Sequence, residues 1–176
     1  MSFSCTPSGE YSTSSAYKLL AASASTSHAS SSNQATQRSF WKGIWKMQVP
    51  NKIKHFVWRV CNDALPTKCN LQRRHITDSD LCEFCKDAPE DALHALCFCS
   101  HVAPVWQPFH WFQSRISPPP LNFYDLLNKF MQVRDELRTE MFATIAWCLC
   151  NRRNALHFGR PAHPIANISF VTGALL

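Results

Sequence analysis

The residues best suited to chemistry lie between Leu81 and Cys99, in the segment LCEFCKDAPEDALHALCFC. Cys82 and Cys85 are separated by two residues, and His94 and Cys99 follow farther along. Two thiolates on a short loop, joined by an imidazole and a third thiolate, form a donor set that zinc binds tetrahedrally. Such an ion also contributes folding free energy to a segment too small to bury a core of its own. The spacing therefore predicts a Cys3His zinc site.

Spacing alone leaves the fourth ligand open. Each residue of an α-helix turns about 100°, so Cys97, three residues after His94, shares its face, whereas Cys99 lies roughly 140° around the helix. Cys99 can reach the metal only if the helix ends or tightens before it, so local geometry favours Cys97. His75 and His101 flank the segment as alternative or supporting ligands, although we expect both to be solvated.

Other reactions fit these residues poorly. Four protein ligands leave no position for a catalytic water, and a thioredoxin-like redox pair would need a βαβ context that is absent. A thiolate shared with zinc is a poor nucleophile, and the four glycines provide no evident oxyanion loop. The twelve Asp and Glu residues show no spaced carboxylate set for two-metal hydrolysis. We therefore expect no enzymatic activity.

Charge is distributed unevenly along the chain, whose formal net charge is +6. Residues 38–74 carry nine Lys/Arg and one acid, a balance of +8, whereas residues 75–100 carry six acids and one lysine, a balance of −5. A basic segment of this size attracts phosphate backbones, although solvated cations on exposed helix faces are as common an explanation. The candidate nucleic-acid contacts are Lys52, Lys54, Arg59, Lys68, Arg73 and Arg74.

The cysteines and the first residues bear on the cellular compartment. Nine cysteines is an odd number, and the start MSFSCTPSGE lacks the basic and apolar regions of a signal peptide. Both features indicate reduced thiols and metal rather than disulfides. No apolar run approaches the about 20 residues that span a bilayer. We expect an intracellular protein of the nucleus or cytoplasm that is not secreted and has no membrane partner.

The apolar pattern predicts a mainly α-helical fold, a small helical domain built around the Cys3His zinc site, or zinc knuckle. Helices are expected from residue 40 to just before Pro50, and over 52–62, 121–129 and 137–156. Two shorter helices should position the metal ligands. Thr67 should cap a helix that runs through Arg74 with Leu71 inward, and Pro89 should open the helix that carries His94.

The remaining segments are expected to lie outside the helical domain. Residues 1–20 look like the truncated end of a longer segment, because a domain rarely opens so abruptly. Residues 21–39 are rich in Ser, Ala and Thr and should form a disordered linker, since they cannot bury enough surface to offset the entropy of ordering. Residues 159–176 should form a flexible tail.

Several motifs recur together in one known family. They are SGEYS at 8–12, SAYKLL at 15–20, WKGIW at 41–45, VPNKIKHFVWR at 49–59, LPT at 65–67, the cysteine–histidine segment and VW at 105–106. This combination resembles the reverse transcriptase zinc-binding domain of plant LINE-type, non-LTR retrotransposon polyproteins. The segment IAWCLCNRRN at 145–154 resembles the helix that precedes a ribonuclease H domain in such polyproteins, with Cys150 replacing a usual aromatic residue.

The resemblance implies Zn²⁺ bound by Cys82, Cys85, His94 and Cys99, thus favouring Cys99 over Cys97. It implies a zinc-binding domain over 40–112 and a helical connector over 121–158. The module would help to hold RNA or DNA without a small-molecule substrate, as an isolated fragment lacking both enzymes of the polyprotein. The alternative is a structural or protein-interaction zinc domain without affinity for nucleic acid.

Overall fold

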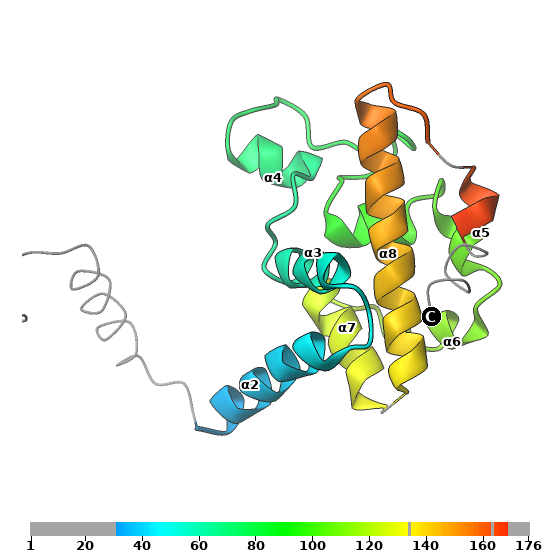
Figure 1. Ribbon diagram of the computed structural model, residues 1–176. Coiled ribbons are helices and arrows are strands. Elements are labelled where there is room, and N and C mark those ends of the chain that lie inside the picture. The colour runs from blue at the N-terminus through cyan, green and yellow to red at the C-terminus, as the bar shows by residue number, and fades with distance from the viewer. Residues whose placement is uncertain (1–30, 134, 163, 169–176) are drawn as a thin grey trace, which may run out of the picture. The chain divides into compact units, whose positions relative to one another are not determined.

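The computed structural model describes residues 31–133, 135–162 and 164–168 (Figure 1). Over these residues the chain forms helices joined by loops, and the one ladder contact among them is an isolated antiparallel bridge between Leu81 and Pro89. This confirms the mainly α-helical fold. No described helix is both long enough and apolar enough to cross a membrane. The chain falls into two compact units, residues 1–39 and 40–176, and the candidate site lies in the second.

The first described helix, α2 (Ser31–Lys46), corrects the expected start at residue 40. Its turns over 35–39 are exposed, whereas Phe40 and Ile44 are buried. A helix anchored by buried residues can extend into solvent. The unfavourable first turn has already formed, so each added residue gains a backbone hydrogen bond without repeating the cost of nucleation. The linker expected over 21–39 is therefore helical from Ser31. Residues 1–20 and 21–30 lie outside the described residues.

Helix α3 (Asn51–Cys61) confirms the predicted apolar stripe. The four residues of that stripe are buried, and the helix follows Pro50. They are Ile53, Phe56, Val57 and Val60. Full burial of each such side chain is worth about 1.5–3 kcal/mol, so the stripe fixes the face that α3 turns inward.

Helix α4 (Lys68–Arg73) is capped as predicted, since the Thr67 side chain accepts a hydrogen bond from the Asn70 backbone N–H at 3.3 Å. Its buried residue is Asn70 rather than Leu71, which is half-buried. The Asn70 side-chain amide donates to the backbone carbonyls of Asp63 and Leu65, both at 2.9 Å. These bonds offset the cost of burying a polar group, so α4 is held to the preceding loop by hydrogen bonds.

An aromatic cluster fills the centre of the second unit. It joins two short helices, α5 (Ala103–Trp106) and α6 (His110–Gln113), to the longer helices that follow. Trp106 stacks on Phe112 with ring centroids 4.3 Å apart, and Phe142 stacks on Phe130 at 4.6 Å. Aromatic pairs of this kind contribute beyond their buried area, so the cluster ties distant parts of the chain together.

Helices α7 (Phe123–Gln132) and α8 (Glu136–His157) belong to the same compact unit as the preceding segment. Helix α8 packs against α3, α7 and the turn that carries His94, as Figure 1 shows for α3 and α7. The segments 40–112 and 121–158, expected as separate regions, thus share one core. Part of the expected tail also packs here, because Ile168 is only 4% exposed.

Candidate metal centre

The first two sulfur donors lie on a tight loop closed by the bridge between Leu81 and Pro89. The Cys82 backbone N–H donates to the Ala88 carbonyl, and the Lys86 N–H donates back to the Cys82 carbonyl, each at 3.0 Å. Lys86 adopts a positive φ of 60°, which lets the chain reverse within the loop. The loop therefore brings both cysteine side chains to one side.

The other two donors come from an irregular turn rather than an α-helix opened by Pro89. Helical residues begin after Asp91, whose carboxylate accepts from the His94 backbone N–H at 2.6 Å. From His94 to Phe98 the turn is a π-helix, and the Cys99 N–H donates to the His94 carbonyl at 2.8 Å. Bonding over five residues widens the turn, so Cys99 returns to the side of His94. The turn ends before Cys99, which allows Cys99 to reach the metal, but the turn widens rather than tightens.

The donor atoms of Cys82, Cys85, His94 and Cys99 all lie within 4.8 Å of one another. The sulfurs of Cys82 and Cys99 are 3.9 Å apart, and the Cys85 sulfur is 3.2 Å from Nε2 of His94. A tetrahedral zinc site with Zn–S bonds of about 2.3 Å has ligand atoms about 3.8 Å apart. The cluster therefore has the donor types and the size that could hold a metal ion.

The alternative donors lie outside this cluster. Cys97 is buried in the hydrophobic core at 3% exposure, and burial raises the pKa of its thiol. His75 is exposed, and the ring of His101 lies 6.0 Å from that of Phe84. The structure thus brings together the four ligands implied by the family resemblance, with Cys99 as the fourth. It leaves out Cys97, which regular helical geometry favoured in that place.

The thiols of the cluster differ in their affinity for protons. Burial, together with the neighbouring Cys82, raises the pKa of Cys99 to about 12. The backbone N–H of Asp87 lowers the pKa of Cys85, because it donates to the sulfur and favours the thiolate. A bound cation would stabilise both thiolates and offset the cost of burying their charge.

Comparisons with known proteins match this part of the chain. A family model described as zinc-binding in reverse transcriptase matches residues 11–106, which include all four donors. The chain belongs to this family. The recognition made from the sequence motifs is therefore confirmed, and the cluster lies in the reverse transcriptase zinc-binding domain.

A relative from Arabidopsis thaliana bears the name "Putative ribonuclease H protein". It is 33% identical over 106 residues, which cover 60% of this chain and 16% of the relative. The chain thus matches only a small part of that protein. No solved structure was found to match the chain.

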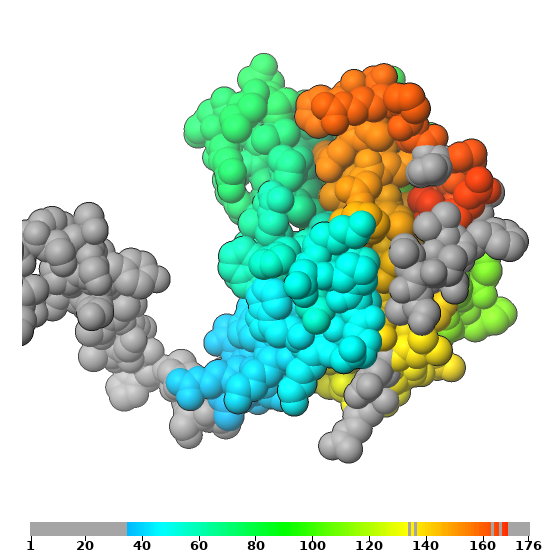
Figure 2. Space-filling model, viewed as in Figure 1, coloured from blue at the N-terminus to red at the C-terminus, as the bar shows by residue number. Residues whose placement is uncertain are grey.

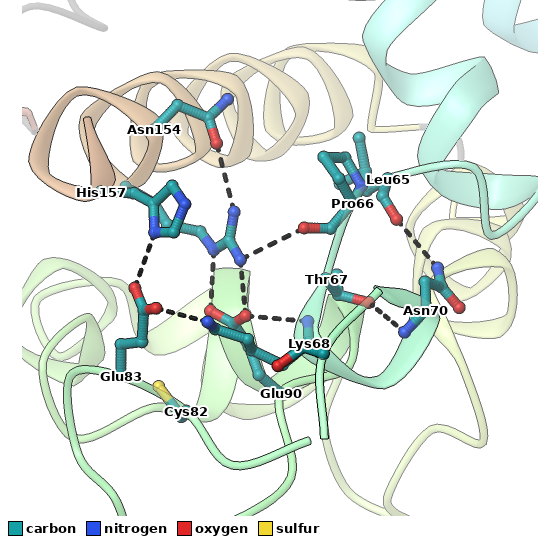
Figure 3. A network of polar contacts seen from close by, with 12 residues as sticks. Leu65, Pro66, Thr67, Lys68, Asn70, Cys82, Glu83, Glu90, Asn154 and His157 are labelled. Carbon is teal, nitrogen blue, oxygen red and sulfur yellow. Dashed lines mark hydrogen bonds and ion pairs between the residues drawn. The ribbon is translucent and has the colours of Figure 1, made fainter. Parts of the chain in front are cut away.

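A buried ion pair joins the zinc-binding domain to α8. Glu90, only 1% exposed, accepts from Nε and Nη2 of Arg153 at 2.7 and 2.5 Å. The same carboxylate accepts from the Lys68 backbone N–H at 3.1 Å, as Figure 3 shows. A helix opened by Pro89, as the sequence predicts, would place Glu90 in its first turn, but Glu90 precedes the helix and faces inward. Nothing in the sequence signalled its pairing with Arg153.

A second polar group lies beside Cys82 (Figure 3). Glu83 forms an ion pair with Lys68 and also contacts Nδ1 of His157 at 2.7 Å. The hydrogen bond from Lys68 lowers the pKa of Glu83, with a further contribution from His157. The loop of Cys82 is thus tied both to α4 and to the end of α8.

Two of the six candidate nucleic-acid contacts are engaged by carboxylates of this chain. Lys68 pairs with Glu83, and its side chain is only 16% exposed. Arg73 lies 3.1 Å from Asp63 on the surface. Both cations are therefore less available to phosphate than the sequence alone suggested.

The other candidate contacts have no carboxylate partner among the described residues. On α3, the Lys54 ammonium donates to the Trp45 carbonyl at 3.1 Å and Arg59 donates to the Ala64 carbonyl at 3.3 Å. The remaining two cations are exposed. They are Lys52 on α3 and Arg74 at the end of α4.

Proposed function

We propose that the chain is a non-catalytic zinc module, derived from a retrotransposon reverse transcriptase polyprotein, that helps to hold RNA or DNA. The observation that carries this proposal is the convergence of four donor atoms within 4.8 Å, inside the segment that matches the family. Zinc would tie the loop of Cys82 and Cys85 to the turn of His94 and Cys99.

The donor chemistry supports zinc over other biological cations. Three sulfurs and one imidazole are soft or borderline ligands, whereas Ca²⁺ and Mg²⁺ require oxygen ligands. Four protein ligands also complete a tetrahedron, so a bound ion would have no open position for water. A structural role follows, and metal-assisted hydrolysis does not.

The nucleic-acid part of the proposal is supported by the cations of α3 and α4. Among the described residues, Lys52, Lys54, Arg59 and Arg74 have no carboxylate partner, so each can neutralise a phosphate without first breaking an ion pair. Lys68 and Arg73 would contribute less, because Glu83 and Asp63 already neutralise them.

The experiment is a salt titration of binding by the zinc-loaded protein to a fluorescently labelled single-stranded RNA, followed by anisotropy. Affinity should fall steeply with salt, with a log–log slope of about −0.7 for each neutralised phosphate. The single variants Lys54→Glu, Arg59→Glu and Arg74→Glu should each weaken binding and flatten this slope. Arg160→Glu is the matched control on a surface outside α3 and α4, and it should bind as the parent does.

A second function is favoured by the ion pairs of Lys68 and Arg73. These pairs neutralise two of the six candidate cations, so α3 and α4 carry less free positive charge than their sequence suggests. It is a structural or protein-interaction domain in which zinc only completes the fold. The same titration separates the two proposals. Zinc-dependent folding without affinity for RNA or DNA would support the second and refute the first.

A further inference from the structure

A groove lies between α3 and α8, with the loop over 65–67 and the turn after His94 as its other walls. Its volume is about 440 Å³, within the range of sites that bind small ligands. Figure 2 views the face on which α3, in cyan, and α8, in orange, lie side by side. The polar and aromatic residues that matter most in its lining are Lys52, His55, Arg59, Trp147, Asn151 and Asn154.

The charge of the lining favours an anion. It includes Lys52, Arg59 and Arg153, and none of the described Asp or Glu residues lines the groove. Arg153 is neutralised by Glu90, whereas Lys52 and Arg59 have no carboxylate partner in the described part of the chain. These two are seven residues apart on α3, so they share a face about 10 Å apart along the axis. That distance can accommodate more than one negative group.

The wall formed by α8 adds a surface suited to a nucleobase. Trp147 is half-buried, and the Lys52 ammonium lies 4.5 Å from the centroid of its ring, which places one ring face towards α3. One turn farther along α8, Asn151 is exposed and presents an amide that can both donate and accept hydrogen bonds. An aromatic face beside an amide and a cation is the combination that holds an unpaired base next to its phosphate.

We propose that this groove binds single-stranded nucleic acid, with an unpaired base against Trp147 and Asn151 and neighbouring phosphates on Lys52 and Arg59. On binding, the Lys52 ammonium would move from the ring to a phosphate, and the base would take its place on the ring. A duplex cannot fill the groove in this way, because its bases are stacked and paired inside the helix. This inference rests on the proposed nucleic-acid function and assigns it a site.

The test compares a single-stranded oligouridine RNA with a duplex RNA of equal length at the same salt concentration. Trp147→Leu should weaken single-strand binding on the order of tenfold, as expected when one stacked base is lost, with little change for the duplex. Asn151→Ala should weaken single-strand binding in the same direction. Arg74→Ala, which removes a cation outside the groove, is the control and should weaken the binding of both ligands equally.

Because Trp147 also packs against the core, its variant must first match the parent in zinc content and circular dichroism. If it does not, Asn151→Ala decides, since this side chain is exposed and its loss leaves no cavity. Equal losses for both ligands, or no loss in the folded variants, would overturn the assignment to the groove.

A crosslinking experiment with the parent protein locates the base directly. Oligouridine that carries 5-iodouridine should crosslink under ultraviolet light to the peptide containing Trp147. Crosslinks confined to α4 would overturn the groove and leave the proposed nucleic-acid function standing. If neither RNA binds to zinc-loaded protein at any salt concentration, both proposals fail together.

Discussion

Glu90 and Arg153, 63 residues apart in sequence, form a two-point ion pair in the interior of the second unit. Burial by itself would lower the pKa of Arg153, but the hydrogen bond and charge of Glu90 outweigh this effect and raise it. The pair therefore joins the segment just before the His94 turn to α8 through two charged groups. Each charged group offsets the cost of removing the other from water.

Arg153→Met should destabilise the zinc-loaded protein by about 3–5 kcal/mol, because it leaves the Glu90 carboxylate buried without its partner. Urea unfolding followed by circular dichroism measures this loss. The double variant Glu90→Gln with Arg153→Met should be less destabilised than the sum of the two single variants, since it removes both charges.

Arg138→Met is the matched control, because the ion pair that Arg138 forms with Asp135 is partly exposed on both sides. Loss of this pair should cost no more than about 1 kcal/mol. Equal effects of Arg138→Met and Arg153→Met would show that the buried pair has no special role in stability.

The fourth metal ligand gives a second prediction. Cys99→Ser should lower the affinity for zinc sharply, because it removes a sulfur that lies 3.9 Å from that of Cys82. Cys97→Ser should retain one zinc per chain and lose only stability, because Cys97 lies in the core and outside the cluster. Zinc stoichiometry of both purified variants, measured by elemental analysis, distinguishes them. Loss of zinc in Cys97→Ser alone would instead favour the helical geometry.

Much of the fold follows from local sequence. The apolar residues of α3 recur at helical spacing, so they lie on one face of the helix and that face is buried. Thr67 supplies the hydroxyl that accepts a hydrogen bond from the first turn of α4. The long apolar band of α8 likewise predicted its bounds to within a residue at each end. These features depend on neighbours a few positions away, so spacing is enough to identify them.

The remaining features depend on partners distant in sequence or on an irregular backbone. The π-helix at His94 cannot be read from a period of 3.6, so helical geometry favoured Cys97, and only the family resemblance favoured Cys99. The pairing of Glu90 with Arg153 required the two segments to meet in the fold. The lining of the groove likewise depends on the packing of two helices, since Lys52 comes from α3 and Trp147 from α8.

Zinc affinity should depend on pH, and the pKa shifts give the sign. Because the pKa of Cys99 is raised to about 12, its sulfur carries a proton at neutral pH and must release it to bind zinc. Lower pH therefore opposes zinc binding, and affinity should rise about tenfold per pH unit for each proton released. Cys85, whose pKa is lowered, should contribute less of this dependence. Competition with a chromophoric chelator between pH 6 and pH 8 measures the slope, and affinity independent of pH would contradict the prediction.

The aromatic core should also support the metal centre through Trp106. Its indole N–H donates to the carbonyl of Leu96, inside the π-helix between His94 and Cys99, at 2.9 Å. Trp106→Phe leaves that buried carbonyl without its donor, which should cost about 1–3 kcal/mol and lower the melting temperature.

The same variant should weaken zinc binding, because the turn that carries two of the proposed ligands loses a support. Trp58→Phe, at a side chain that is 43% exposed, is the control and should change neither quantity. Melting curves of both variants with and without a chelator provide the measurement. If Trp106→Phe lowers stability equally in zinc-loaded and zinc-free protein, the indole supports the core alone and does not position the turn for the metal.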